Sequence, residues 1–442
     1  MSLTFLAHRD ERTRAVKKGV TATIVVKTCL YLMRLIYVPA LLGALGKTDY
    51  GVFLTVSALA NWLANDFGIG AAAINLISRQ REHDSGNYPR DYASTTFYLT
   101  AVIAVLIFSA IYLFQAPVIH FLFANNFQSP EEISKVSLLL TMNLAVSCVS
   151  LVLNHSVNIM RAQQRTNRVL YAQLCSQAVS IAVLLAASSR GASTVALFAI
   201  ASCQNIATPI IATIDLYGFS AQRLPSLNDV SLKVLRATFS QALKLVAIQV
   251  LQLALLSAPT LLISSLLGPS SVPTFSVPFS LLSVAASVCG EIGLILWPSY
   301  GGAIQIGDFD WVREAARKSA FYCFAAMGFV AVAFAAIGPF VVHLWTPSIA
   351  PSHALCGVLG VYFMFRTTAE IVGVPAIALG FEKLKAISLS LVLTQQVVVT
   401  PFLFPSLGLL AVPVVGALAY CIDGIIVGRV VNTRLASYNS AG

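Results

Sequence analysis

The stretch VVKTCLYLMRLIYVPALLGALGKTDYGVF, from Val25 to Phe53, decides the fold class, because most of it is an apolar helix long enough to lie in lipid. Two cations, Lys27 and Arg34, interrupt that helix. Seven residues make about two helical turns, so both cations lie on one face, with Tyr31 between them. A charge inside a membrane span is costly and faces the bundle interior or a watery cavity. We therefore expect this face to line a cavity; snorkelling of Lys27 to the interface and ion pairing with a neighbouring helix are the alternatives.

The composition is that of a chain whose main solvent is lipid. Hydrophobic residues make up 57% of the 442 residues and charged residues only 10%, whereas a soluble domain has about 25% charged residues. Apolar runs of roughly 20 residues, the length that a membrane-spanning helix needs, recur along the whole chain. A transmembrane barrel would need short alternating strands. The sequence therefore predicts an all-α polytopic membrane protein.

Signals of catalysis or of metal binding are missing from the sequence. It contains no phosphate loop, no nucleophile elbow and no soluble catalytic domain. The eight cysteines all fall within apolar runs, and no pair has the spacing of metal ligands. We therefore expect a protein that is not an enzyme and has neither a cofactor nor a metal.

The apolar runs predict twelve spans in two six-helix lobes. The expected spans are at about 20–45, 51–77, 92–115, 134–158, 169–188, 192–214, 241–266, 273–298, 319–343, 354–379, 386–404 and 408–428. These spans divide the chain into an N-terminal tail (1–19), an N-lobe (20–214), a linker (215–240), a C-lobe (241–428) and a C-terminal tail (429–442).

The loop charges predict the orientation. With the N-terminus in the cytoplasm, 22 of the 28 Lys and Arg residues fall in cytoplasmic segments, including Lys383 and Lys385 in one short loop. The outer loops hold only Lys47, Lys135 and Arg190. This asymmetry follows the positive-inside rule and places both termini in the cytoplasm. It also accounts for the net charge of +10 without nucleic acid as a partner.

The two halves of the chain show an internal repeat at a shift of 222 residues. The shift places LGKTDYGVF (45–53) on LGPSSVPTF (267–275). Six residues are identical across the shifted window: Leu45, Gly46, Phe53, Leu59, Ala64 and Gly68 match Leu267, Gly268, Phe275, Leu281, Ala286 and Gly290. Two sets of six spans in the same orientation form a parallel duplication, which predicts a substrate site between the halves near the bilayer midplane.

The second expected span carries polar residues of its own. Asn61 and Asn65 are four residues apart and share a helix face, with Asp66 about 100° further round. Amides that line a cavity can bind hydroxyl-rich groups such as sugars, and interhelical hydrogen bonding is the equally weighted alternative. Asp66 can pair with a first-span cation, bind a coupling ion, or do both at different stages.

The second half carries a different set of charges. Val288 is the repeat mate of Asp66, and the acid is found at Glu291, one turn further on. Arg366 and Glu370 lie four residues apart, so they either neutralise each other or contribute to substrate binding and ion coupling. Asp423 adjoins a pattern of small residues that favours helix packing.

Two motifs in the first half carry a family resemblance. LGKTDYGVF, residues 45–53, resembles the LGPxDYGxF-like motif that follows the first helix of the polysaccharide transporter family, the O-antigen and exopolysaccharide flippases. NDFGIGAAAIN, residues 65–75, is similar to that family's DLGLG-type segment, and it contains Gly68. The family belongs to the multidrug/oligosaccharidyl-lipid/polysaccharide exporter superfamily.

The triplet Asp49, Tyr50 and Gly51 carries the first motif, and we expect it to be structural. Asp49 can cap the second helix, and Gly51 permits a close approach of another segment. The second-half copy lacks this triplet.

The resemblance implies a flippase that moves an undecaprenyl-diphosphate-linked oligosaccharide across the bacterial inner membrane. Members keep a cationic cavity between two lobes, and Lys27 and Arg34 lie where such cavity cations lie. The implied partners are the lipid-linked substrate, the bilayer, and polysaccharide polymerase and assembly proteins. A drug–cation antiporter or a lipid II flippase of the same superfamily is the alternative, and a membrane glycan polymerase or ligase is a weaker one.

Overall fold

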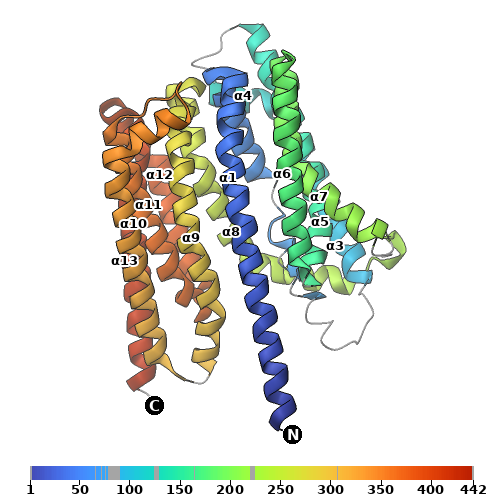
Figure 1. Cartoon of the computed structure of the whole chain (residues 1–442), viewed down its shortest axis with the longest axis vertical. Helices are drawn as coiled ribbons and strands as arrows, with labels where there is room; N and C mark the ends of the chain where they lie inside the picture. Colours follow the sequence, from blue (N-terminus) through green and yellow to red (C-terminus); the bar gives the residue numbers. More distant parts are fainter. Residues whose placement is uncertain are drawn as a thin grey trace. The chain divides into compact units, whose positions relative to one another are not determined.

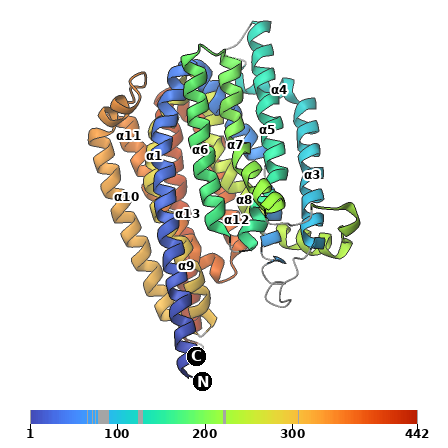
Figure 2. The ribbon, with the colours of Figure 1, turned by 45° about the vertical axis from the view of Figure 1, so that its right-hand side comes forward.

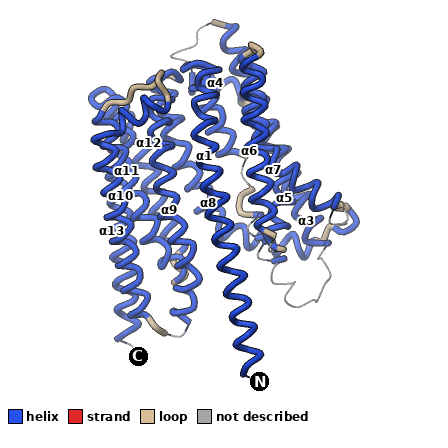
Figure 3. Tube along the Cα trace, viewed as in Figure 1, coloured by secondary structure: helices blue, strands red, loops and turns tan. Residues whose placement is uncertain are grey.

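The computed structural model describes residues 2–64, 66–70, 72–74, 76–77, 90–123, 129–163, 165–219, 224–305 and 307–440. The backbone of Lys27 and Glu291 is described but their side chains are not, and Asn65 lies outside the described residues. Every regular element within these ranges is a helix, as Figure 3 shows. The all-α prediction is confirmed.

Long helices make up both halves of the chain (Figure 1). The first half contains α1 (Ser2–Leu63), α3 (Arg90–Leu113), α4 (Gln115–Phe123), α5 (Pro130–Ala162), α6 (Thr166–Ser189) and α7 (Thr194–Ile214). The second contains α8 (Leu232–Leu267), α9 (Val272–Gln305), α10 (Phe309–Trp345), α11 (His353–Ala378), α12 (Glu382–Leu407) and α13 (Ala411–Ser440). Four short turns of other helix types are interspersed: η1 (Asp215–Phe219), η2 (Leu227–Asp229), η3 (Pro269–Ser271) and η4 (Gly408–Leu410).

Ten stretches of the described chain are long and apolar enough to cross a membrane. Two of them are each divided into two helical segments. Thr28–Trp62 is interrupted at Gly46, where the backbone is not helical, and Glu382–Ala436 contains both α12 and α13, which are separated by η4. The ten stretches therefore agree with the twelve expected spans, and the protein is a multi-pass membrane protein.

The second expected span, 51–77, is not one continuous helix. The helix ends at Leu63, and the backbone turns through Phe67 and Gly68, which have φ values of 49° and 83°. Helical structure resumes at Ile69. Residues rarely adopt positive φ unless they are glycine, so the turn is built around Gly68.

The chain forms two compact units. The first comprises Met1–Gly46, Leu63–Ala116 and Ser134–Leu243, and the second comprises Lys47–Trp62, Pro117–Ile133 and Lys244–Gly442. The end of the first unit at Leu243 lies close to the expected end of the linker. The assignment of 20–214 and 241–428 as functional lobes stays a prediction.

Hydrogen bonds between polar side chains join the helices of the first unit. Asn143 of α5 donates to Ser202 of α7 over 3.0 Å, and Thr213 of α7 donates to Ser156 of α5 over 2.9 Å. On the other side of α5, His155 lies 3.3 Å from the Thr96 hydroxyl of α3. Such bonds hold helices together where lipid provides no hydrophobic driving force between them.

The second unit has a continuous apolar core. Helix α11 packs against α9, α10, α12 and α13, and Figures 1 and 2 both show α10 and α11 side by side. The ring of Phe279 on α9 stacks on that of Phe275 in the same helix. It also contacts the tilted rings of Tyr362 and Phe363 on α11, and the ring centres of the three pairs are 4.8–6.0 Å apart. These aromatic side chains fix how α9 and α11 pack together.

The backbone supports the internal repeat. Gly46 has φ 76° and ψ 171°, and Gly268, 222 residues later, has φ 86° and ψ 160°. Both glycines separate two helices, and both adopt a conformation that is essentially restricted to glycine. The two copies of the repeat therefore make the same backbone turn at the same place.

The two repeat motifs also meet within the second unit. A Cβ atom on Gly51 would overlap the backbone carbonyl of Pro269. Close by along the same pair of segments, Ser257 of α8 donates a hydrogen bond of 3.0 Å to the carbonyl of Ala58. Gly51 thus lies where the backbone of the second copy approaches most closely.

Candidate functional site

The cation at the centre of the opening stretch is exposed. Arg34 lies on α1 inside the apolar stretch Thr28–Trp62, and its side chain is open on the surface of the first unit. It forms no ion pair with any other residue whose side chain the structure describes. Tyr31, on the same face, is half-buried, whereas Tyr37 is buried. Arg34 is therefore available to an anionic ligand.

Asp66 stabilises the break in the second span. One carboxylate oxygen accepts a hydrogen bond of 3.1 Å from the backbone N–H of Gly68, and the other accepts one of 2.9 Å from Gly70. These bonds satisfy the free N–H groups at the start of the new helix, and the negative charge suits that helix terminus. Asn158 of α5 lies directly against Gly70, and Arg161 of α5 interacts electrostatically with Asp66.

The remaining polar residues of the second span are placed differently. Asn61 is exposed near the end of α1, in the second unit, while Asp66 belongs to the first. The expected pairing of Asn61 with Asn65 falls on a residue outside the described ones. Asp49 lies in the first helical turn after the Gly46 break, three residues beyond it, and Tyr50 is buried.

Arg366 and Glu370 form an ion pair along α11. The Nε atom of Arg366 donates to Oε1 of Glu370 over 3.0 Å, and the guanidinium lies 5.8 Å from the centre of the Phe363 ring. The Arg366 side chain is 19% exposed and that of Glu370 is 44% exposed. The pair is therefore neutral as a whole, but its acid remains reachable.

A second ion pair in the same unit lies much deeper. The Nζ atom of Lys385 on α12 donates to Oδ2 of Asp423 on α13 over 2.8 Å, with side-chain exposures of 4% and 0%. The expectation that Lys385 lies in a loop is wrong, whereas its position on the cytoplasmic side stays a prediction. The residue lies in the first turn of α12, and its Cε atom would be 3.0 Å from a Cβ on Gly373 of α11. Gly373 thus leaves room for the lysine stem.

Further polar atoms are buried along α12 and α13. Oδ1 of Asp423, Oγ of Ser388, both amide atoms of Gln396 and Oγ1 of Thr400 are buried with no hydrogen-bond partner among the described residues. Buried polar groups in native proteins are almost always satisfied by protein, water or an ion. Ser388 lies about one turn from Lys385, whereas Gln396 and Thr400 lie about three and four turns further along α12, so these atoms are separate polar positions rather than one site.

Sequence reasoning missed this region because its members come from separate helices. Lys385 and Asp423 are 38 residues apart, and neither belongs to a recognisable motif. One signal was available in the sequence: Ser388, Gln396 and Thr400 lie at helical spacing from Lys385, on one face of a mostly apolar run.

Comparison with known families identifies the class of protein. The family described as "Polysaccharide biosynthesis protein" matches residues 16–298. The chain belongs to this family. The match includes both motifs of the first half and their repeat mates, so the resemblance seen in those residues is confirmed. A search of curated protein sequences finds no significant match.

Solved structures with the same fold are transporters of the MOP superfamily, the multidrug/oligosaccharidyl-lipid/polysaccharide exporters. An inward-facing multidrug resistance MATE family transporter is 16% identical with a TM-score of 0.76, covering 92% of this chain and 95% of its own. An outward-facing MATE transporter is 15% identical with a TM-score of 0.59, covering 96% and 95%. A MOP superfamily transporter from Pyrococcus furiosus is 16% identical with a TM-score of 0.58, covering 95% and 94%. At these identities the likeness shows the fold alone: the chain is a multi-pass membrane protein of the polysaccharide biosynthesis family, with the fold of these transporters.

Proposed function

We propose that the protein is a flippase that moves an undecaprenyl-diphosphate-linked oligosaccharide across the bacterial inner membrane for lipopolysaccharide or exopolysaccharide assembly. Both termini lie in the cytoplasm in this proposal, as the 22 cations of the inner segments favour. The mechanism is alternating access, in which the diphosphate and glycan pass through the protein and the lipid tail stays in the bilayer. The protein performs no covalent chemistry and needs no cofactor.

Arg34 is the observation that carries the proposal. An exposed guanidinium inside a membrane stretch is costly unless it meets water or an anion. A diphosphate offers several oxygens at the spacing that a guanidinium can grip in a fork. Lys27, about two helical turns earlier on the same face, supplies a second positive charge in this proposal. Asn61, Asn65 and Arg366 are the further candidates for contacts with sugar or phosphate.

We assign the motive force to cation antiport through one of three acids, Asp66, Glu291 and Glu370. Of the two acids whose side chains the structure describes, Asp66 and Glu370, the second has the more suitable surroundings, because it is partly exposed and holds Arg366 at 3.0 Å. A proton or metal cation that binds this carboxylate competes with Arg366 and frees the guanidinium. Asp66 already uses both oxygens to stabilise the helix that begins at Ile69.

The alternatives fit these residues less well. A drug–cation antiporter binds cationic ligands, for which the exposed Arg34 is the wrong charge. One solved MOP superfamily transporter is described as having a binding pocket of reversed polarity that suggests a different function, so the sign of the pocket charge matters within this fold. Lipid II flippases often carry two additional spans, and glycan polymerases commonly build their site on a large outer loop. Neither feature is expected from this sequence.

A deletion strain tests the proposal. Without the protein, lipid-linked oligosaccharide accumulates on the cytoplasmic side and polymerised surface glycan is lost; plasmid-borne protein restores both. Sidedness is measured by digestion with a membrane-impermeant glycosidase in inside-out and right-side-out vesicles. Normal surface glycan in the deletion strain, in the absence of a redundant flippase, would refute the proposed function.

Arg34→Glu in the same strain tests the residue. We expect the variant protein to reach normal levels but to leave the oligosaccharide on the cytoplasmic side, because the reversed charge repels the diphosphate. Lys47→Glu is the matched control, since Lys47 is also an exposed cation of α1, and we expect it to transport normally. Full export by Arg34→Glu would remove Arg34 from the site.

A further inference from the structure

The residues just before the membrane stretch of α8 form an ordered segment with an unusual surface. Residues 224–243, named here the interfacial segment, include η2 and the first turns of α8, and the same helix contains the stretch Val246–Leu267, which is long and apolar enough to cross a membrane. Several large apolar side chains of the segment are exposed: Leu224, Leu227, Val230, Leu232, Phe239 and Leu243. Leu232 is 70% exposed and Phe239 is 56% exposed. These side chains need an apolar environment that the described residues do not provide.

The helical part of the segment is amphipathic in an uncommon way. Val234, Thr238 and Ala242, at spacings of four, are buried against the first unit. The opposite face exposes Leu232, Lys233, Arg236, Phe239 and Leu243. Cations and large apolar side chains thus share the exposed face. Neighbouring apolar groups and cations suit the membrane interface, where acyl chains and charged headgroups meet.

Hydrogen bonds to α3 hold the segment in place. The backbone N–H of Ser226 donates to Oγ of Ser94 over 3.1 Å, and that of Ser231 donates to Oγ1 of Thr95 over 3.0 Å. Near them, the hydroxyl of Tyr98 donates to the carbonyl of Pro225 over 3.4 Å. The exposed face therefore has a fixed direction within the first unit and is not that of a loose linker.

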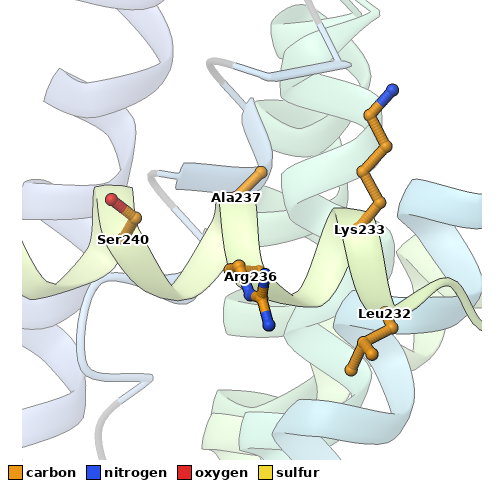
Figure 4. Close-up of a pocket in the computed structure, with 5 residues that line it drawn as sticks. All are labelled: Leu232, Lys233, Arg236, Ala237 and Ser240. Atoms are coloured by element: carbon orange, nitrogen blue, oxygen red, sulfur yellow. The ribbon is translucent and has the colours of Figure 1, made fainter.

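A depression of about 530 Å³ lies along this face, lined by Leu232, Lys233, Arg236, Ala237 and Ser240. Figure 4 shows Lys233 extending to the side of Ala237 and Ser240 and Arg236 extending to the other side of the helix. The two cations are therefore suited to contact separate headgroups rather than to grip one phosphate. Neither forms an ion pair with a described residue, and Asp229 is the only acid in residues 224–243.

We propose that the interfacial segment binds the headgroup layer of a membrane that contains anionic phospholipids. The apolar side chains enter the acyl boundary, and Lys233 and Arg236 contact lipid phosphates on either side of the helix. Charge complementarity supports this occupant, because the segment joins exposed cations to exposed apolar groups directly before a membrane span. The binding fixes the start of α8 at the membrane surface, and it does not depend on the identity of the transported substrate.

Lipid titration of the full chain in neutral detergent tests the proposal. Phosphatidylglycerol and phosphatidylcholine are added separately, and bound lipid is counted by native mass spectrometry. We expect phosphatidylglycerol to bind more tightly than phosphatidylcholine. Lys233→Gln with Arg236→Gln should weaken phosphatidylglycerol binding by roughly twenty-five-fold, since each cation near an anionic surface contributes about fivefold. Exchange of the two cations, Lys233→Arg with Arg236→Lys, keeps both charges and should bind like the unaltered chain.

The control is Lys383→Gln with Arg429→Gln, which removes two exposed cations from other helices. We expect this control to bind phosphatidylglycerol as the unaltered chain does. Equal binding of the two phospholipids, or unchanged binding in the Lys233 and Arg236 double variant, would overturn the proposal. So would a site that binds undecaprenyl diphosphate but not phosphatidylglycerol, because the segment would then receive transport substrate. Since both altered residues are exposed, size-exclusion profiles should match across the variants.

Discussion

Charged residues within the apolar part of the chain occupy two contrasting environments. Arg34 is exposed without an ionic partner among the described side chains, whereas Lys385 and Asp423 are buried together. A buried charge is tolerated when it is paired and hydrogen-bonded, and it becomes very costly when its partner is removed. The first environment suits ligand binding, and the second suits the packing of α12 against α13.

The buried pair should therefore respond to single and double substitutions in opposite ways. Lys385→Ala should destabilise the protein by about 3–5 kcal/mol, because Asp423 is left buried and uncompensated. Combining Lys385→Met with Asp423→Leu should recover most of that loss, since no charge remains buried. Thermal unfolding of the purified chain in detergent measures both effects.

An exposed ion pair supplies the control for this prediction. Lys318 and Glu314 on α10 form such a pair, with a separation of 2.5 Å. Because surface pairs contribute only about 0–1 kcal/mol, Lys318→Gln should hardly change the unfolding temperature. If Lys385→Ala is as mild as Lys318→Gln, the buried pair is not important for stability.

At the scale of elements, glycines decide where helices break. Gly46 and Gly268 have nearly the same positive φ and extended ψ, and each ends one helix before the next begins. An L-residue is strained in that conformation whatever space surrounds it. The repeat is therefore a repeated backbone turn rather than a repeated set of polar side chains.

Gly46→Ala and Gly268→Ala should each destabilise the protein by about 1–3 kcal/mol. Gly43→Ala and Gly290→Ala are the matched controls. Each of these glycines lies inside a helix, has no positive φ, and has no atom within 4 Å of an added Cβ. Alanine favours helix at such positions, so the controls should be neutral or slightly stabilising. Unfolding temperature and the yield of monodisperse protein are the readouts. Equal behaviour of the two pairs would contradict this account of the turns.

At the scale of the whole molecule, orientation follows from the distribution of cations. In a variant in which the eight cysteines are replaced, Lys47→Cys and Arg190→Cys should react with an impermeant maleimide in intact cells. Lys383→Cys should react only after the inner membrane is opened. All three positions are exposed, so access to the reagent depends on the side of the membrane. Labelling of Lys383→Cys in intact cells would invert the proposed topology.

Much of the architecture could be predicted because lipid imposes local rules on the sequence. The twelve spans follow from apolar length, and the family resemblance follows from the residues around Asp49 and Gly68. The break between the helix end at Leu63 and the turn at Gly68 could not be predicted from length, since hydropathy is the same for a continuous helix and for one interrupted at a Gly68 turn. Here the hydrogen bonds of Asp66 decide which form is adopted.

The sequence by itself determined that this protein lies in a membrane, that its helices are of spanning length, and that its motifs belong to a polysaccharide biosynthesis family. Only the tertiary structure decided that Lys385 is buried against Asp423 and that the linker exposes a basic and apolar face. Hydropathy is a sum over residues that are neighbours in the sequence, so it indicates whether a segment lies in water or in lipid. Pairing of α12 with α13, and of residues 224–243 with α3, depends on contacts between distant segments, which no local sum contains.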